Sequence, residues 1–220
     1  MNKENTKLTH RMLTYNYSLL PNKYLATMEY INTNLRSAIE KTGLTIGYPA
    51  WNLLYYSLLC SLPKEGEKII VETGTNLGFS TIILAQVLKD LNIKGRVYSV
   101  DINKNMIKSA EQNIAKANLN EYIHLHVGDS LNFLSWLVSE KTHIDFAFLD
   151  SDHEYKQIIK EFSIIHAKIV ACKGKVYFDN TSSGGVARAL KFIKTKFGGN
   201  IIEFKNCSWY PPGNAIWQPD

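Results

Sequence analysis

The sequence predicts an α/β fold in which a doubly wound, mostly parallel sheet carries helices on both faces. A strand-like run at residues 69–71 is followed by a turn that contains Gly74 and Gly78, and then by an apolar helix. A second strand, over residues 96–100, ends on a carboxylate, and the order of strand and helix then repeats along the chain. Regular alternation of strands and helices is typical of a parallel sheet that binds its ligand beyond the carboxyl ends of its strands.

The individual elements follow from hydrophobic periodicity and from the residues that interrupt it. Helices are predicted over residues 22–42, 48–61, 79–91, 104–117, 130–139, 154–170 and 185–197. Strands are predicted over residues 69–71, 96–100, 122–127, 144–149, 175–178, 200–204 and 215–217. The last two are joined through Pro211-Pro212-Gly213, which favours a turn between them.

One domain is sufficient for a chain of 220 residues, of which 45% are hydrophobic. We divide this domain into an N-terminal helical extension over residues 1–66 and a ligand-binding part over residues 67–220. In the extension, an amphipathic stripe with spacing i, i+3, i+4, i+7 begins at Trp51. The stripe favours a packed helical face or a homodimer contact, and a lid or substrate wall is the alternative.

Charge and cysteine content narrow the class of protein further. The net charge is +5, but no aromatic and basic residues alternate as a single-strand platform would require, so the basic residues are read as the solvated faces of helices. Three widely spaced cysteines predict neither a disulfide framework nor a metal site. The start of the chain lacks an apolar signal core, and no apolar run reaches membrane-spanning length. We therefore expect a cytoplasmic protein that uses neither nucleic acid nor a membrane.

The first glycine turn indicates a nucleoside ligand without a pyrophosphate. Dinucleotide sites need a further glycine between the two that flank the turn, and here other residues fill the space between Gly74 and Gly78. Glu72 would repel two phosphates, whereas it suits S-adenosylmethionine, which carries a sulfonium cation and an ammonium group. Asp101, at the end of the next strand, is placed to accept hydrogen bonds from a ribose diol.

The stretch Val71 to Thr81 resembles the first motif of class I S-adenosylmethionine-dependent methyltransferases. Later strand ends follow in the order of that family, at Asp101, at Val127-Gly128-Asp129-Ser130 and at Phe148-Leu149-Asp150. The resemblance covers roughly residues 68–181. It implies a Rossmann-like sheet of seven strands that ends in an antiparallel hairpin. It also implies a cofactor site made of Glu72, Gly74, Thr75, Asn76, Gly78, Ser80, Asp101, Ile102, Gly128, Asp129, Ser130 and Asp150.

Within that implied site, the first turn surrounds the methionine part of the cofactor, Asp101 binds the ribose, and Asp129 with Ser130 lies near the adenine. For Asp129 a helix cap is an equally good interpretation, because a Gly-Asp-Ser sequence often starts a helix. Glu72 would orient the turn or a water molecule near the ammonium group.

A candidate metal site follows the fourth and fifth strands, which end on Asp150 and on Asp179-Asn180. Two carboxylates and an amide oxygen form a set of hard oxygen ligands that suits Mg²⁺. Asp and Asn also cap helices and hold turns after strands, which is the alternative for each residue alone. Together they resemble the metal-dependent O-methyltransferases of the catechol type. That resemblance implies that Asp150, Asp179 and Asn180 hold Mg²⁺ against two neighbouring substrate hydroxyls.

His153 is the candidate catalytic base. In the catechol type a lysine occupies this position, three residues after the first metal-binding Asp. The sequence Asp150-Ser151-Asp152-His153 instead resembles the Asp-x-Asp-His of a related branch of metal-dependent sugar and natural-product O-methyltransferases, in which the His is the base. That branch often has Asp-Asp where this chain has Asp179-Asn180, so the chain combines two patterns. A histidine with an ordinary pKa of ~6.5 can take a proton at neutral pH, and the alternative is a residue that only lines the pocket.

These observations predict Mg²⁺-dependent O-methylation of a hydroxyl on a small molecule, such as a phenolic or sugar-containing natural product, with S-adenosylmethionine as the methyl donor. The alternatives are a metal-independent methyltransferase on another substrate and a non-catalytic S-adenosylmethionine-binding protein of the same fold. A nucleotide-dependent oxidoreductase is disfavoured by the missing glycine and by Glu72. Substrate contacts are expected from the N-terminal helices, the 181–185 loop and the segment 207–212.

Overall fold

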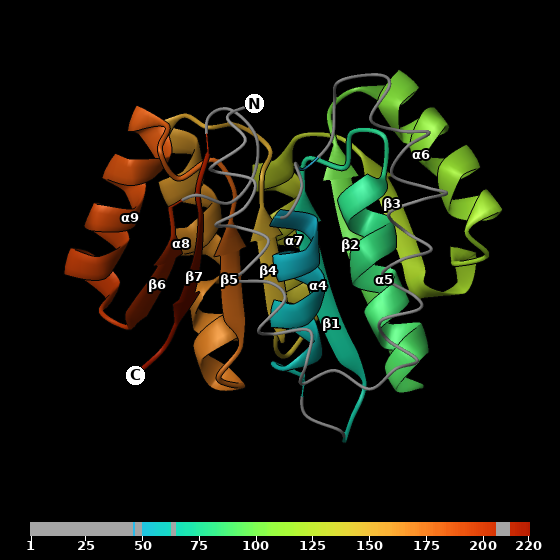
Figure 1. Cartoon of the computed structure of the whole chain (residues 1–220), viewed down its shortest axis with the longest axis horizontal. Coiled ribbons are helices and arrows are strands. Elements are labelled where there is room, and N and C mark those ends of the chain that lie inside the picture. The colour runs from blue at the N-terminus through green and yellow to red at the C-terminus, as the bar shows by residue number, and fades with distance from the viewer. Residues whose placement is uncertain (1–45, 47–49, 63–64, 206–211) are drawn as a thin grey trace, which may run out of the picture.

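The computed structural model describes residue 46 and residues 50–62, 65–205 and 212–220, and these residues form a seven-stranded sheet with helices on both faces (Figure 1). The strands are β1 (Lys68–Thr73), β2 (Gly95–Asp101), β3 (Ile123–Val127), β4 (Phe146–Leu149), β5 (Lys175–Phe178), β6 (Asn200–Phe204) and β7 (Asn214–Gln218). The helices are α4 (Ala50–Leu59), α5 (Phe79–Leu91), α6 (Lys104–Lys116), α7 (Ser130–Glu140), α8 (Tyr155–Ala171) and α9 (Gly184–Phe197), with a short 3₁₀ turn, η2 (Asn120–Tyr122), before β3.

The strand order is β3-β2-β1-β4-β5-β7-β6. Strands β1 to β5 pair in parallel, whereas β7 is antiparallel to both β5 and β6 and lies between them. The predicted doubly wound sheet and its terminal antiparallel hairpin are therefore confirmed. The chain winds outward from β1 in one direction through β2 and β3, and then returns to the other side of β1 to form β4. The switch point between β1 and β4 is where such sheets bind ligands.

The register of the central strands brings three chain segments together at one edge of the sheet. Thr73 pairs with Leu149, and Leu149 pairs with Phe178. The residues that follow the ends of β1, β4 and β5 are Gly74, Asp150 and Asp179, respectively. Because neighbouring strands lie only ~5 Å apart, these three residues leave the sheet side by side.

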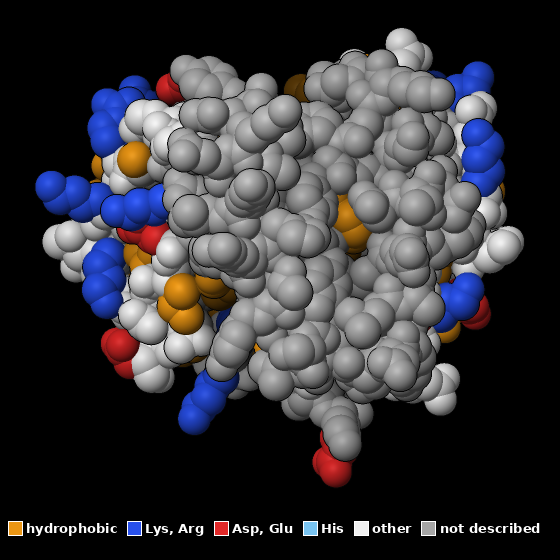
Figure 2. Space-filling view, in the orientation of Figure 1, with side chains coloured by type: hydrophobic (Ala, Val, Ile, Leu, Met, Phe, Trp, Pro, Cys, Tyr) orange, Lys and Arg blue, Asp and Glu red, His pale blue; other side chains and the backbone are white. Residues whose placement is uncertain are grey.

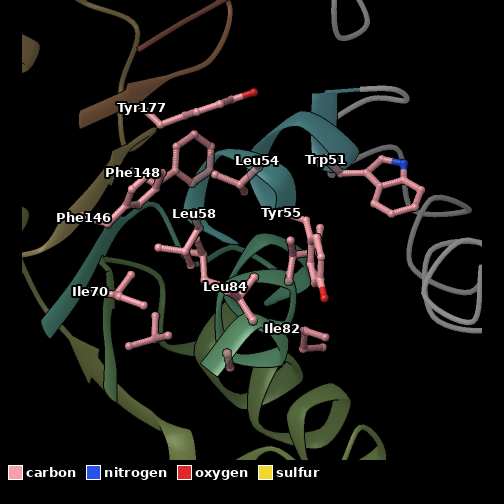
Figure 3. Close-up of a cluster of buried hydrophobic side chains, with 14 of the residues drawn as sticks. Trp51, Leu54, Tyr55, Leu58, Ile70, Ile82, Leu84, Phe146, Phe148 and Tyr177 are labelled. Atoms are coloured by element: carbon pink, nitrogen blue, oxygen red, sulfur yellow. The ribbon is translucent and has the colours of Figure 1, made fainter. Parts of the chain in front are cut away.

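One hydrophobic core lies between the sheet and helices α4, α5 and α6 (Figure 3). The stripe that begins at Trp51 is buried in it, and its Leu54 and Leu58 lie close to Phe148 and Tyr177 of the sheet. The stripe of α4 is thus a packed helical face. The predicted helix over residues 22–42 and most of the predicted substrate segment 207–212 lie outside the described residues.

The opposite face of the sheet is covered by α7, α8 and α9. Phe162 of α8 lies at the centre of this second core, with no solvent exposure. Its ring contacts Trp217 of β7 at a centroid distance of 4.9 Å and Phe197 of α9 at 5.2 Å. Phe162 therefore connects α8 and α9 to the last strand of the chain.

The outer face of α9 carries basic residues, which gather at one side of the molecule in Figure 2. The exposed members are Arg188, Lys191, Lys194 and Lys196. The opposite face of the same helix is apolar and buried, so these charges occupy the solvated side of an amphipathic helix, as predicted. Among the described residues, no helix combines the length and the hydrophobicity that crossing a bilayer would need.

We expect Phe162→Ala to lower the free energy of unfolding by about 3–5 kcal/mol, because it leaves a cavity beside the rings of Trp217 and Phe197. The matched control is Val170→Ala in the same helix, where the side chain is 42% exposed and the expected change is below about 0.5 kcal/mol. Urea unfolding followed by circular dichroism measures both. Equal losses in the two variants would contradict the central position of Phe162.

Candidate active site

A cavity of about 250 Å³ opens at the carboxyl edge of the sheet, beyond the ends of β1, β2 and β3. Its lining consists of Gly74, Val100, Asp101, Ile102, Gly128, Asp129, Ser130, Ser151, Asp152 and Gln157. The predicted cofactor residues among them are Gly74, Asp101, Ile102, Gly128, Asp129 and Ser130. The cavity is thus lined by residues from three predicted strand ends, at the switch point of the fold.

A larger cavity of about 400 Å³ lies between α9 and β6. Its charged side chains are those of Lys191, Lys194 and Glu203, all of them exposed. We place the candidate site at the smaller cavity, because polar residues of separate strand ends converge there.

The floor of the smaller cavity depends on Gly74. This residue adopts a φ of 88°, a left-handed conformation that favours glycine. A Cβ atom at this position would lie 2.3 Å from the carbonyl oxygen of Asp150, so only glycine allows the two segments to touch. The backbone N–H of Asp150 in turn donates to the carbonyl of Thr73 at 3.1 Å. The first turn and the loop after β4 are therefore held in direct contact.

Asp101 connects the first turn, between Gly74 and Gly78, to the turn that follows β2. Its Oδ2 accepts a hydrogen bond from the backbone N–H of Asn76 at 2.7 Å, and its Oδ1 accepts one from the N–H of Asn103 at 2.8 Å. A carboxylate oxygen has two lone pairs, so both oxygens keep the capacity to accept a further bond from a diol. The backbone bonds fix the carboxylate where it faces the cavity.

Asp129 caps a helix and also lines the cavity. Its Oδ1 accepts a hydrogen bond from the backbone N–H of Asn132 at 2.9 Å, and it thereby caps α7. The same residue lines the cavity. The cap fixes the direction of the carboxylate, because the start of the helix holds one of its oxygens.

Glu72 lies beneath the first turn and is fully buried. One carboxylate oxygen accepts hydrogen bonds from the hydroxyls of Thr81 and Ser99, and Ser99 also bonds Thr75 at 2.6 Å. Burial raises the pKa of Glu72 to about 7, and the nearby hydroxyls, Ser80 included, oppose that rise. Its other oxygen, Oε1, has no hydrogen-bond partner among the described residues.

The remaining predicted cofactor residues of the first turn are outside the lining of this cavity. They are Glu72, Thr75, Asn76, Gly78 and Ser80. The structure places them under the turn or along it, where Thr75 and Glu72 belong to one buried hydrogen-bonded group and Asn76 binds Asp101 through its backbone.

Asp150 and His153 form a hydrogen-bonded pair, in which Nε2 of His153 lies 3.2 Å from Oδ1 of Asp150. Burial raises the pKa of Asp150, and the hydrogen bond with His153 opposes that rise. The same bond raises the pKa of His153, burial opposes it, and the negative charges of Asp150, Asp179 and Asp152 add to the rise. The imidazole is 45% exposed, so it is accessible to a ligand.

Asp179 is buried, and its Oδ1 accepts hydrogen bonds from the side-chain amide of Asn214 at 2.6 Å and from the backbone N–H of Asn180 at 2.8 Å. Asn180 itself adopts a φ of 53° in the turn after β5. The start of α9 packs against the neighbouring loop, because a Cβ atom at Gly185 would lie 1.9 Å from the carbonyl oxygen of His153. The loops after β4 and β5 are therefore in contact through their backbones.

The donor set of the predicted metal site fits Mg²⁺ in its chemistry. Asp150 and Asp179 leave adjacent strands at the same level of the sheet, and both carboxylates act on the pKa of His153. Asn180 adds an amide group beside Asp179. In the part of the chain that the structure describes, no group of three or more His, Cys, Asp or Glu side chains could hold a metal ion. The predicted set consists of two carboxylates and an amide oxygen, and a small number of protein ligands is usual for Mg²⁺.

Two residues of the site were not among the predicted ones. Asn214 is the first residue of β7 and donates to Asp179 at the end of the neighbouring strand β5. The signal for it in the sequence was a polar residue beside the predicted 215–217 strand. Glu161 is buried in α8 and binds three residues of the cavity. A carboxylate between Ile158 and Phe162, on the apolar face of the helix, was the signal for it.

The sheet order, the switch-point cavity and the acidic strand ends define the fold of class I S-adenosylmethionine-dependent methyltransferases. The family model described as "Methyltransferase domain" matches residues 71–181, and the chain belongs to that family.

Two curated relatives and one solved structure illustrate the similarity. The chain is 30% identical over 134 residues to a catechol O-methyltransferase of Niastella koreensis, a match that covers 57% of this chain and 59% of the relative. It is 29% identical over 160 residues to caffeoyl-CoA O-methyltransferase 2 of Eucalyptus globulus, with 66% and 60% covered. The chain thus spans about three fifths of the length of these curated relatives. An O-methyltransferase of Bacillus cereus in complex with SAH has a similar fold, with a TM-score of 0.67, 19% identity, and 89% of this chain and 91% of that chain covered.

We expect Gly74→Ala to destabilise the protein by about 1–3 kcal/mol, because the new methyl group meets the carbonyl of Asp150 in a conformation that disfavours side chains. Gly184→Ala is the matched control, since a Cβ atom there meets nothing within 4 Å and alanine suits the first turn of α9. Thermal unfolding of both variants measures the effect. A stable Gly74→Ala protein would contradict the close contact between the two loops.

Glu72 makes the folded state bind a proton between its ordinary pKa of 4.5 and its folded value of about 7. Protonated Glu72 therefore stabilises the folded state at acidic pH. The free energy of unfolding falls by about 3 kcal/mol as the pH rises from the ordinary pKa through the folded one. We expect Glu72→Gln to remove this loss, so that the variant gains stability relative to the wild type between pH 5 and pH 8. Urea unfolding of both proteins at each pH gives the difference, and a constant difference would show that Glu72 has an ordinary pKa.

Proposed function

We propose that this chain is an S-adenosylmethionine-dependent O-methyltransferase that acts on a hydroxyl group of a small molecule and uses Mg²⁺. The observation that carries the proposal is the register of β1, β4 and β5, by which Asp150 and Asp179 leave the sheet in line with Gly74, a residue of the cavity lining. His153 is bound to Asp150. A nucleoside cofactor and a group of acidic and basic side chains would then meet at one place.

The cavity supports S-adenosylmethionine as the cofactor. Asp101 would accept hydrogen bonds from the ribose diol, and the wall around Asp129 and Ser130 would face the adenine. The methionine part would extend past Gly74 toward Asp150, since these two residues touch. The solved neighbour from Bacillus cereus contains SAH, which supports the same class of ligand here.

Asp150, Asp179 and Asn180 would hold the metal ion. When it is bound, Mg²⁺ lowers the pKa of a coordinated hydroxyl and fixes the position of its oxygen. The amide of Asn214 and the backbone of Asn180 keep the carboxylate of Asp179 in one orientation, and Gly74 keeps Asp150 close to the cavity.

His153 would take the proton of the substrate hydroxyl. Its Nε2 lies against the carboxylate of Asp150, which favours the proton on Nε2 and leaves Nδ1 as the basic nitrogen. The bond from the substrate oxygen to the methyl carbon then forms as the bond from that carbon to sulfur breaks. The proton moves to Nδ1, and S-adenosylhomocysteine leaves with a neutral sulfur.

The substrate class follows the relatives rather than the described side chains. The two curated relatives are named as O-methyltransferases of catechol and of caffeoyl-CoA. We therefore propose a phenolic small molecule as the substrate of this chain. The resemblance of residues 150–153 to sugar and natural-product O-methyltransferases supports a sugar-containing molecule as the alternative.

Calorimetric titration of the protein with S-adenosylhomocysteine, with and without Mg²⁺, tests the proposal. We expect Asp101→Asn to weaken cofactor binding about tenfold or more, and Asp179→Asn to remove Mg²⁺ binding and to leave cofactor binding in place. Glu154→Gln is the control, because this exposed residue beside His153 makes no side-chain cap to α8.

Cofactor binding without Mg²⁺ binding would replace the metal-dependent reaction with one in which His153 acts alone. Failure to bind the cofactor would overturn the assignment as a methyltransferase.

A further inference from the structure

The buried carboxylate of Glu161 accepts hydrogen bonds from four side chains, three of which line the cavity. The side chain is only 1% exposed. Its Oε1 accepts from the hydroxyl of Ser130 at 2.6 Å, from the hydroxyl of Ser151 at 2.5 Å and from the amide of Gln157 at 3.1 Å. Its Oε2 accepts from the hydroxyl of Thr73 at 3.1 Å. The proposed methyl transfer gives Glu161 no part in the chemistry.

These donors come from separate parts of the chain. Thr73 ends β1, Ser130 begins α7, Ser151 lies between β4 and α8, and Gln157 lies one turn before Glu161 in α8. Three of the four, Ser130, Ser151 and Gln157, line the cavity. Glu161 therefore fixes one wall of the cavity from behind.

The hydrogen bonds also decide which way the wall's polar groups point. Burial raises the pKa of Glu161, and the hydrogen bonds from its four donors oppose that rise and favour the ionised form. An ionised carboxylate accepts and cannot donate, so Ser130 and Ser151 direct their protons toward Glu161. Gln157 directs its N–H groups inward too, because its Nε2 also donates to the oxygen of Ser130 at 2.8 Å. The hydroxyl oxygens left facing the cavity can then act only as acceptors. The carboxylates of Asp129 and Asp152, which line the same cavity, are acceptors as well.

We propose that Glu161 is a positioning residue that makes this wall an acceptor surface and so selects a cofactor whose base carries an exocyclic amine. This inference rests on the proposed function, in which the ribose lies at Asp101 and the base lies beyond it, at Ser130. The amine of adenine donates hydrogen bonds to such a wall. A carbonyl at the same position of the base, as in hypoxanthine, would place an acceptor against acceptors and leave both unpaired.

The test compares S-adenosylhomocysteine with S-inosylhomocysteine by calorimetric titration of the whole chain. The two compounds differ in that amine and carbonyl and in the adjacent ring nitrogen N1, which carries a hydrogen only in hypoxanthine. We expect the wild type to bind the adenosyl compound about tenfold or more tightly than the inosyl compound. In Glu161→Gln one carboxylate oxygen becomes an amide group that donates. Where this group takes the place of Oε1, the hydroxyls of Ser130 and Ser151 lose their acceptor and can turn their protons toward the cavity. The preference for the adenosyl compound should then fall several-fold.

Asp145→Asn is the matched control. Asp145 is also a buried carboxylate, but it lies at the opposite edge of the sheet, where it binds the backbone N–H of Ile69 and lies near Lys68 and His143. Its substitution should lower stability and leave the ratio of the two affinities unchanged. This control separates a loss of stability from a change in the polarity of the wall.

A Glu161→Gln protein that binds both compounds more weakly by the same factor would overturn the inference, because Glu161 would then only stabilise the fold. If this variant does not fold, Ser130→Ala removes one acceptor from the wall and keeps Glu161, and an unchanged ratio in that variant overturns the inference as well. A wild-type protein that binds neither compound would instead refute the proposed function.

Discussion

The parallel pairing of β4 with β1 on one side and β5 on the other is the constraint on which the site depends. Parallel strands carry their carboxyl ends to the same edge, and the register found here makes Gly74, Asp150 and Asp179 leave that edge together. The separate loops then contact one another through backbone atoms, at Gly74 and at Gly185. The positions of the acidic groups are thus set by the sheet and by two glycines rather than by flexible side chains.

Buried carboxylates lie beneath this edge on both faces of the sheet. Glu72 and Thr73 are consecutive in β1 and point to opposite faces, as alternation in a strand requires. Glu72 meets the hydroxyls of Thr81 and Ser99 on the α5 face, whereas Thr73 meets Glu161 on the α8 face. Burying a carboxylate is costly, and the surrounding hydroxyls offset much of that cost. The apolar core therefore ends in a polar layer that holds the turns above it.

The sequence allowed the sheet and the acidic strand ends to be predicted, because each depends on local patterns. Asp101, Asp150 and Asp179 follow apolar runs, and strand ends of a parallel sheet meet at one edge. The length of β1 was underestimated, since Glu72 and Thr73 still pair with Ser99 and Val100. A polar residue at the end of a strand weakens the hydrophobic signal without ending the hydrogen-bonded ladder.

The partners of the acidic residues could not be predicted in the same way. The bond between Thr73 and Glu161 joins residues 88 positions apart, and the bond between Asp179 and Asn214 joins residues 35 positions apart. Such contacts depend on the packing of α8 and on the insertion of β7 between β5 and β6, and periodicity does not report either one. A polar residue on an otherwise apolar face was the available signal for both, and its partner had to come from the structure.

The position of β7 has a consequence for the order in which the molecule assembles during synthesis. β7 follows β6 in the chain, yet it lies next to β5 and supplies the amide that orients Asp179. The ribosome therefore synthesises β1 to β5 and their acidic ends before it synthesises β7. The nascent chain can form the parallel part of the sheet early, whereas Asp179 at its edge receives the hydrogen bond from Asn214 only after β7 has inserted.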